Sequence, residues 1–389
     1  MLLDRSRLQI NPLKVRKHKL DIRAIAIDPD SPTPAVDDRS GAQIANLAVR
    51  MAKARSKGRP VMLTYGAHLI KNGLAPMLVR LVKEGWVTHL ATNGAGSIHD
   101  WEFAYLGLST EDVRANTAKG EFGTWDETGR YTSLAVALGG LEQIGYGWSM
   151  GKMIAEDGLR VPSEDDILSE LDRIAADCAA DERVGAWADL LYLVRAFRLP
   201  AGWQHIDHPC KEYSIQLAAY EHRVPLTIHP GIGYDIIYTH PMSCGGAIGR
   251  GALWDFLSFA ESVSRLEDGV HMTVGSAIMA PMVFEKSMSM ANNLAMQRIG
   301  QPISGHYLAV VDIQNGGDWD WEKGEPPMDN PAYYLRFCKS FYRMGGTLDY
   351  ICLDNRAFLL NLYHELEHFK LAIENQPKKS HDAREGQHS

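Results

Sequence analysis

The sequence lacks the long hydrophobic runs that a membrane-spanning segment needs. No uninterrupted apolar run in its 389 residues approaches the ~18–20 residues that cross a bilayer. The first residues, Met1 to Arg5, also lack the apolar stretch and the small-residue cleavage site of a signal peptide. We therefore expect neither a membrane protein nor a secreted one.

Cysteine and positive charge are scarce as well. The five cysteines are scattered and form no CxxC pair, which argues against a disulfide framework and against a thiolate zinc site. Acidic residues outnumber basic ones, 48 to 40, and no basic stripe is present, which argues against nucleic acid or an anionic membrane as the main partner. The hydrophobic content of 45% is that of a globular protein, and we expect a cytoplasmic one.

Short apolar runs rich in β-branched residues alternate with longer helical patterns along the chain. The runs cover residues 61–64, 87–92, 224–229, 270–275, 307–313 and 350–354. Strands that alternate with helices indicate βαβ units, so we predict an α/β fold: a doubly wound, mostly parallel Rossmann-like sheet with helices on both faces. Such sheets bind ligands at the carboxyl ends of their strands.

The middle of the chain has a different pattern. Residues from about 106 to 200 contain no convincing strand, and residues 163–176 form an amphipathic helical pattern with Ser163 as the N-cap. We interpret this stretch as a helical insertion in a single domain of residues 1–375. Residues 376–389 are polar and predict a disordered tail.

Small residues follow three of the predicted strands. The three turns are Gly66-Ala67-His68, Thr92-Asn93-Gly94 and Gly275-Ser276-Ala277. Small side chains let the backbone approach a ligand closely, and the start of the following helix offers free N–H groups to a phosphate. None of the turns is a GxGxxG motif, so ordinary tight turns are the alternative interpretation. Taken together, the three turns predict a dinucleotide lying across the end of the sheet.

Three further motifs allow two interpretations each. The glycine-rich stretch 243–251 either holds an anion with Arg250 or is a flexible connection before a helix at residues 252–263. The acidic stretch around Asp318, Asp320 and Glu322 either lines the entrance to a site or is a solvated loop. His364 and His368 match HExxH, a zinc-binding pattern, but paired charges on an exposed terminal helix are the alternative.

The residues around the turns resemble the deoxyhypusine synthase family. LTYGAHLIKNGL (63–74) is similar to the family's LGYTSNLISSGI, and VTHLATNGAGSIHD (87–100) is similar to its VDVLVTTAGGVEED. The resemblance extends from about residue 60 to residue 369. It implies an NAD-binding fold and a homotetramer with active sites between paired subunits. It also implies NAD contacts from Ala67, His68, Thr92, Asn93, Gly94, Gly275, Ser276, Asp354 and Asn355, and a polyamine contact from Asp235.

The departures from this family concern the chemistry. The family's glutamate pair becomes Ile98-His99, and the lysine that forms its covalent imine falls on Phe341, two residues from Lys339. Without that lysine the aminobutyl group has no enzyme nucleophile to occupy. Polyamine transfer through Lys339, with a shifted register, is therefore an alternative interpretation.

We predict an NAD-dependent enzyme that transiently removes a hydride from an amine or a polyol-like small molecule, with elimination, hydrolysis or group transfer to follow. His99 is the leading acid/base candidate near neutral pH, with Asp100 beside it at the edge of the turn. Asp235 is expected to hold a cationic or hydroxylated group. The alternatives are a polyamine transferase, a non-catalytic NAD-binding relative, and a zinc hydrolase using HELEH.

Overall fold

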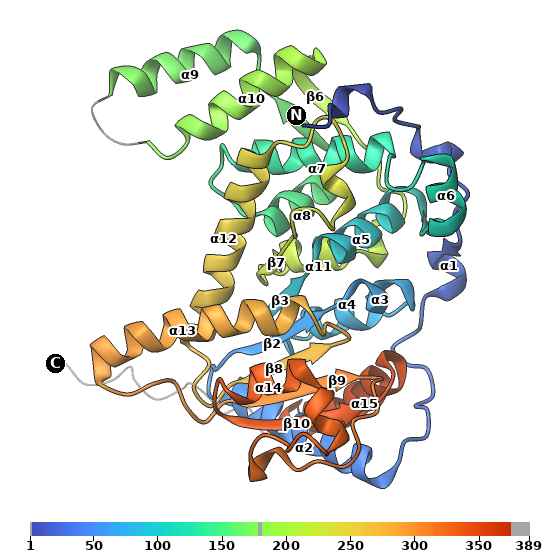
Figure 1. Ribbon diagram of the computed structural model, residues 1–389, viewed down its shortest axis with the longest axis vertical. Helices are drawn as coiled ribbons and strands as arrows, with labels where there is room; N and C mark the ends of the chain where they lie inside the picture. Colours follow the sequence, from blue (N-terminus) through green and yellow to red (C-terminus); the bar gives the residue numbers. More distant parts are fainter. Residues whose placement is uncertain (1, 178–180, 375–389) are drawn as a thin grey trace, which may run out of the picture.

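A six-stranded, fully parallel sheet forms the centre of the computed structural model, which describes residues 2–177 and 181–374 (Figure 1). Its strands are β2 (Val61–Tyr65), β3 (His89–Thr92), β7 (Leu226–Ile228), β8 (Val270–Val274), β9 (Tyr307–Asp312) and β10 (Thr347–Cys352). Each lies on one of the predicted apolar runs. The predicted doubly wound α/β fold is confirmed.

The strand order explains where a ligand site can form. The order is β10-β9-β8-β2-β3-β7, so the first strand, β2, lies beside the fourth, β8. This is the 3-2-1-4-5-6 order of doubly wound dinucleotide-binding sheets. The chain leaves β2 toward β3 and β7 on one side and returns to β8 on the other. In sheets of this order the ligand crevice forms where the strand order reverses, which is here at the carboxyl ends of β2 and β8.

Helices cover both faces of the sheet, and each face has its own core. One face packs α2 (Asp38–Ser56), α4 (Ala75–Lys83), α11 (Ile215–Glu221) and α15 (Asn355–Glu374); the other packs α12 (Gly245–Ser264), α13 (Met279–Ile299) and α14 (Arg336–Tyr342). Within β2, Leu63 belongs to the first core and its neighbour Met62 to the second. Burial on both faces is why the strands are continuous apolar runs.

The remaining helices lie mainly near the carboxyl end of the sheet. They are α1 (Ile22–Ile25), α3 (Ala67–Lys71), α5 (Gly94–Leu106), α6 (Val113–Lys119), α7 (Asp126–Gly139) and α8 (Tyr146–Glu156), together with the 3-10 turns η1 (Arg5–Arg7), η2 (Leu13–Val15), η3 (Lys211–Tyr213), η4 (Ile236–Tyr238), η5 (Trp321–Lys323) and η6 (Pro331–Tyr334). Of these, α3 and α5 begin directly after β2 and β3 and pack against each other.

The middle of the chain contains strands that the sequence pattern did not predict. β4 (Leu108–Ser109) pairs with β1 (Leu20–Asp21), and β5 (Gly158–Val161) pairs antiparallel with β6 (Gly202–His205). The prediction of a strand-free stretch is wrong because these strands are only two to four residues long and several of their side chains are partly exposed.

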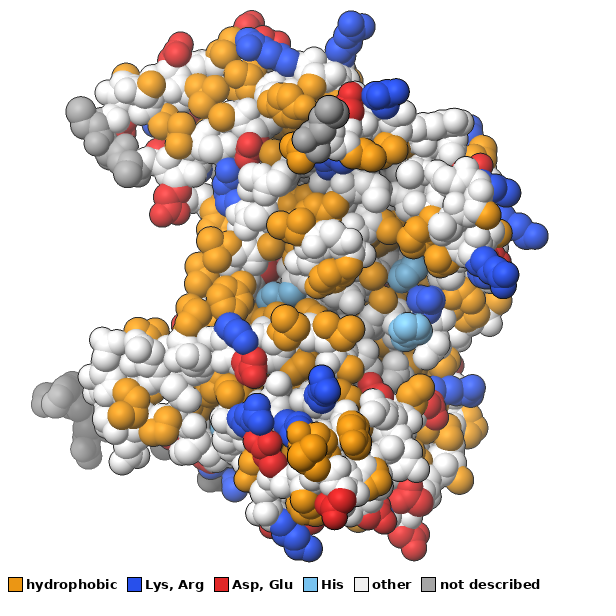
Figure 2. Space-filling view, in the orientation of Figure 1, with side chains coloured by type: hydrophobic (Ala, Val, Ile, Leu, Met, Phe, Trp, Pro, Cys, Tyr) orange, Lys and Arg blue, Asp and Glu red, His pale blue; other side chains and the backbone are white. Residues whose placement is uncertain are grey.

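The helical part of this stretch does form a hairpin. α9 (Glu164–Ala176) and α10 (Val184–Phe197) lie between β5 and β6 in the chain and project from the body of the protein (Figure 1). The predicted N-cap is confirmed, since the N–H of Asp166 donates to Ser163 Oγ at 3.1 Å. Figure 2 shows a hollow between this hairpin and α13, with apolar side chains along α12.

The glycine-rich stretch is helical, because α12 begins at Gly245 and not after the glycines. Arg250 donates to Asp189 of α10 at 3.1 Å, so its charge joins two helices, and neither predicted interpretation of the stretch holds. None of the helices in the described ranges could cross a membrane. The predicted tail at 376–389 lies outside the described residues.

Candidate functional site

The turns after β2 and β8 touch at the point where the strand order reverses. The N–H of Gly66 donates to the carbonyl of Val274 at 3.2 Å, and a Cβ on Gly66 would lie 2.1 Å from the carbonyl oxygen of Gly275. Gly275 has a φ of +61°, which disfavours other residues. Two glycines are therefore required for the two turns to meet.

Asn355, the first residue of α15, lies against the turn after β8. A Cβ on Gly275 would lie 3.3 Å from the Asn355 amide, and Asn355 is 7% exposed. No described residue forms a hydrogen bond with that amide. Buried amides almost always have a partner, so this one is available to a ligand. The neighbouring Asp354 is occupied, because its Oδ1 accepts from the N–H groups of Arg356 and Ala357 at 2.9 and 3.0 Å.

Backbone donors are also available in the turn after β8. Within the described ranges no acceptor meets the N–H groups of Ser276 and Ala277. Consecutive N–H groups in such a turn form a concave site for an anion. Ala67 and His68 lie opposite, in the first turn of α3, and His68 is exposed.

The third turn, at the start of α5, differs from the sequence expectation. Asn93 Oδ1 accepts from the N–H of Gly96 at 2.8 Å, and the N–H of Ala95 donates to the Asp235 carboxylate. Thr92 Oγ1 donates to the carbonyl of Tyr65 at 3.0 Å. Two of the first N–H groups of this helix, those of Ala95 and Gly96, are therefore used within the protein and are not free for a phosphate.

Gly94 is required here for a reason other than cofactor approach. A Cβ at this position would lie 2.7 Å from Asp235 Cγ and 2.8 Å from both carboxylate oxygens. The absence of a side chain at Gly94 therefore makes room for Asp235 at the positive end of α5, where a negative charge is stabilised.

A cavity of about 220 Å³ lies beside α5, at the carboxyl end of β3 and β7. It is lined by the charged residues Arg16, Lys71, Glu102, Glu111 and Asp235, and by the polar residues His99, Thr110 and Tyr234. Ile98, Val113, Phe122 and Ile236 supply apolar walls. The structure thus brings together His99 and Asp235, two residues that the sequence singled out.

His99 belongs to a chain of buried hydrogen bonds. Its Nδ1 lies 2.8 Å from Ser109 Oγ, which donates to Glu102 Oε2 at 2.6 Å. Arg16 in turn donates to both oxygens of Glu102, at 2.8 and 2.6 Å. A serine hydroxyl has one proton, and the ionised Glu102 can only accept, so Ser109 must accept from Nδ1–H of His99. This assignment leaves Nε2 of His99 unprotonated, and no described residue bonds to it.

Burial lowers the pKa of His99 to about 4. The positive charges of Lys71, Arg16 and His68 lower this pKa further, while Glu102 raises it. The imidazole is therefore neutral near pH 7. The expectation that His99 of the free protein exchanges protons near neutral pH is corrected: there it is a neutral acceptor.

Two carboxylates in the cavity have only neutral partners in the protein. Asp235, which is 5% exposed, accepts from the N–H of Gly231 at 2.7 Å and from that of Ala95, and burial raises its pKa. Glu111 accepts from Asn116 Nδ2 at 2.6 Å and from Trp125 Nε1 at 3.0 Å. Neither is paired with a lysine or an arginine among the described residues.

Asp100 holds the start of α11 in place through hydrogen bonds. Its carboxylate accepts from Ser214 Oγ at 2.7 Å, from the N–H of Ile215 at 2.8 Å, and from the N–H and the side-chain amide of Gln216. Burial raises its pKa although these bonds oppose the shift. Asp100 therefore caps the start of α11 and does not line the cavity with His99.

Several residues of the cavity were missed by sequence reasoning. Glu102 follows His99 by three positions, so helical spacing places the two on one face and could have identified it. Arg16 and Glu111 come from segments far from α5 in the chain, and no local pattern marks them. Lys71 ends the short helix after the first turn, where it resembled any surface lysine.

The residues of the alternative chemistries lie elsewhere. Lys339 Nζ sits 3.4 Å from the centre of the Tyr333 ring, a cation–π contact, and does not line the cavity. Phe341 is buried, with its ring 5.7 Å from that of His271 and 5.4 Å from that of Phe284. Neither residue is placed to form an imine in this cavity.

The zinc motif and the acidic loop are likewise apart from the cavity. His364 and His368 are exposed on α15, and in residues 2–177 and 181–374 no cluster of three metal-binding side chains occurs. His381 and His388 lie outside the described residues. Asp318 pairs with Arg39 of α2, and Asp320 accepts from the N–H of Glu322, so both carboxylates are used within the protein.

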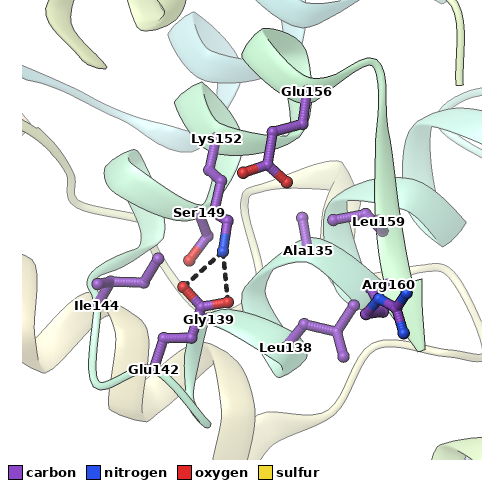
Figure 3. A pocket seen from close by; sticks show the side chains of 10 residues that line it. All are labelled: Ala135, Leu138, Gly139, Glu142, Ile144, Ser149, Lys152, Glu156, Leu159 and Arg160. Atoms are coloured by element: carbon purple, nitrogen blue, oxygen red, sulfur yellow. Dashed lines mark hydrogen bonds and ion pairs between the residues drawn. The ribbon is translucent and has the colours of Figure 1, made fainter. Parts of the chain in front are cut away.

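A smaller cavity lies between α7 and α8 (Figure 3). Its volume is about 50 Å³, and its lysine, Lys152, is paired with Glu142 at 2.5 and 2.6 Å. A cavity of this size has room for one or two water molecules. It is not a substrate site.

Comparisons with known proteins concern the fold. No family model matches the chain, and no curated protein does. Solved structures that match include AgrE with ornithine and NAD⁺ (15% identity, TM-score 0.41, 87% of this chain and 34% of AgrE) and a putative LOR/SDH protein from Methanococcus maripaludis S2 (14%, 0.42, 88% and 71%). A third is ArgZ, a cyanobacterial arginine dihydrolase (14%, 0.41, 86% and 33%). The chain spans about a third of the length of AgrE and ArgZ.

These comparisons correct the family interpretation. The structures named above are AgrE, ArgZ and a putative LOR/SDH protein and not deoxyhypusine synthases, so the predicted membership of that family is wrong. The homotetramer was expected from this family alone and stays a prediction. Light scattering can measure the oligomeric state. The AgrE structure is a complex that contains NAD⁺.

Proposed function

We propose that this chain is an NAD-dependent enzyme that acts on a small amine in the cavity beside α5. The main support is the position of α3, which leads from the carboxyl ends of β2 and β8, where the strand order reverses, to this cavity. This helix begins at Ala67, in the turn after β2, and ends at Lys71, which lines the cavity. Five residues of α-helix span about 7–8 Å, a distance that a dinucleotide bound in the crevice can bridge.

The residues of the crevice fit a dinucleotide. The strand order is that of dinucleotide-binding sheets, and Gly66 and Gly275 leave the backbone bare. The N–H groups of Ser276 and Ala277 suit a pyrophosphate, and the free Asn355 amide suits a polar group of the cofactor. When bound, NAD would accept a hydride from a carbon of the substrate.

The cavity residues would handle the amine and its proton. Asp235 would bind the ammonium group, since no lysine or arginine among residues 2–177 and 181–374 pairs with its carboxylate. Nε2 of His99 would accept a proton from the substrate as the hydride leaves. The hydrogen bonds from Nδ1 through Ser109 to Glu102 would stabilise the positive charge that the imidazole then carries.

Calorimetric titration with NAD tests the cofactor. We expect the parent to bind NAD and Asn355→Ala to bind it about ten-fold more weakly, the loss of roughly one hydrogen bond to a polar ligand. Gln297→Ala, which removes an exposed amide on α13, is the matched control and should bind normally. A folded parent that does not bind NAD would contradict the proposal, as would an unchanged affinity in Asn355→Ala.

A further inference from the structure

We propose that the cavity beside α5 binds an amino acid with a second, side-chain amine. The inference rests on the proposed function, because it names the substrate class of the same cavity. It is carried by the charges that line the cavity and by which of them the protein already neutralises.

One pair of charges cancels within the protein. Arg16 and Glu102 form a bidentate ion pair, and both side chains are almost fully buried. Ser109 and Thr128 donate further hydrogen bonds to the Glu102 carboxylate. A pair satisfied in this way offers little to a ligand. The charges that remain are those of Lys71, Asp235 and Glu111.

The two carboxylates lack a cation. Asp235 and Glu111 are both buried, and every donor that the structure gives them is neutral: backbone N–H groups, an amide and an indole. A buried carboxylate without a cationic partner is costly, and an ammonium group brought by a ligand removes that cost. Two such carboxylates in one cavity suit two ammonium groups.

The lysine lacks an anion. No described residue forms an ion pair or a hydrogen bond with the Lys71 ammonium, although this lysine is close enough to His99 to lower the pKa of the imidazole. A carboxylate on the ligand would pair with Lys71, which also brings the carboxylate to the side of the cavity where α3 leads to the crevice.

The size of the cavity limits the ligand to one small molecule. Its volume of about 220 Å³ has room for one small organic molecule. A diamino acid of the size of lysine fits this description, with one carboxylate for Lys71 and two ammonium groups for Asp235 and Glu111. A diamine lacks the group for Lys71, and a neutral-chain amino acid lacks the second ammonium.

Three probes separate these groups: L-lysine, cadaverine, which lacks the carboxylate, and L-norleucine, which lacks the side-chain amine. With NAD present, we expect the parent to bind L-lysine at least about ten-fold more tightly than either of the others. Lys71→Met should remove the advantage over cadaverine while leaving cadaverine affinity unchanged. Asp235→Asn and Glu111→Gln, which keep hydrogen-bonding capacity, should weaken both L-lysine and cadaverine.

Lys53→Met, on the exposed face of α2, is the matched control and should leave all three affinities unchanged. Circular dichroism of each variant establishes that it is folded. The inference is overturned if the folded, NAD-loaded parent binds none of the probes, if it binds L-norleucine as tightly as L-lysine, or if Lys71→Met weakens cadaverine equally. The NAD titration is separate: binding of L-lysine in this pattern without NAD binding would contradict the proposed function and leave the inference standing.

Discussion

Neighbouring residues of one helix serve different purposes in this protein. His99 lines the cavity, whereas Asp100 accepts four hydrogen bonds at the start of α11. Successive residues of an α-helix point about 100° apart, so adjacency in the sequence does not place two side chains in one site. Predictions at the scale of the residue therefore treat the two separately.

The first prediction concerns His99. His99→Asn keeps hydrogen-bonding capacity but cannot accept a proton, so kcat should fall about 10²–10⁴-fold if Nε2 is the base. Steady-state kinetics with an amine that the parent converts measure the decrease in kcat. NAD titration of the same variant is the control. A folded variant that binds NAD and turns over within a few-fold of the parent would refute the catalytic role.

The second prediction concerns the protonation of His99. Burial and nearby positive charge favour the neutral imidazole, so the group should titrate at about 4 in the free protein, and its neutral form should be lost only as the pH falls toward that value. Lys71→Met removes one positive charge and should raise this pKa. NMR of the histidine ring carbons measures both. Titration near 6.5 in the parent would show that the imidazole is not desolvated.

At the scale of the element, α5 is the helix whose first turn carries the site. Its N–H groups hold Asp235 and Asn93 in place of a phosphate, so the helix positions a carboxylate. We therefore expect the pyrophosphate of NAD at the turn after β8. Two changes on this helix separate its roles.

Gly94→Ala should disturb the substrate site more than the cofactor site. Its Cβ would lie 2.7 Å from Asp235 Cγ and would displace the carboxylate, so amine affinity should fall at least about ten-fold while NAD affinity stays within a few-fold. Gly249→Ala in α12 meets nothing within 4 Å and should be neutral to binding and stabilising by about 0.5–1 kcal/mol. Calorimetry with both ligands decides; a variant with weaker NAD binding alone would place the cofactor on α5.

Asp100→Asn should lower stability and leave chemistry intact. The amide cannot accept all four hydrogen bonds at the start of α11, which should cost about 1–3 kcal/mol of unfolding free energy. Urea unfolding measures the cost and kcat measures the chemistry. Unchanged stability together with lost turnover would return Asp100 to the catalytic site.

At the scale of the whole molecule, histidines buried between the sheet and α12 make stability depend on pH. Burial lowers the pKa values of His89, His229 and His271 to about 3. His89 bonds to Ser262 Oγ at 2.8 Å and to Thr227 Oγ1 at 3.1 Å, and His271 bonds to Thr64 Oγ1 at 2.9 Å, all as neutral rings. The unfolded chain protonates these groups near pH 6.5, and the folded protein does so only near pH 3.

The unfolded state therefore binds more protons between these two values, and stability falls as the pH drops below about 6.5. Each histidine contributes at most about 2 kcal/mol of this loss by pH 5. Urea unfolding at pH 7 and pH 5 should show the decrease, and His271→Gln, which cannot titrate, should show less of it. Equal stability of the parent at the two pH values would contradict the prediction.

The sequence by itself determined the elements of the fold and part of the site. Runs such as 61–64 and 270–275 are apolar throughout because both faces of their strands are buried, and that pattern is local. His99 was visible as a polar residue near a strand end, and Asp235 was singled out through the resemblance to the deoxyhypusine synthase family. Short turns of small residues, however, occur wherever a parallel strand leads into a helix, and they led to the wrong family.

The tertiary structure decided the rest. The chain crosses from β7 to β8 over the sheet, and no local pattern shows on which side of β2 it returns, so the position of the crevice could not be read from the sequence. The cavity gathers Arg16, Lys71 and Glu111 from three separate segments. Whether a charge is free for a ligand depends on which partner packs against it, and only the folded chain shows that Arg16 has one and Lys71 does not.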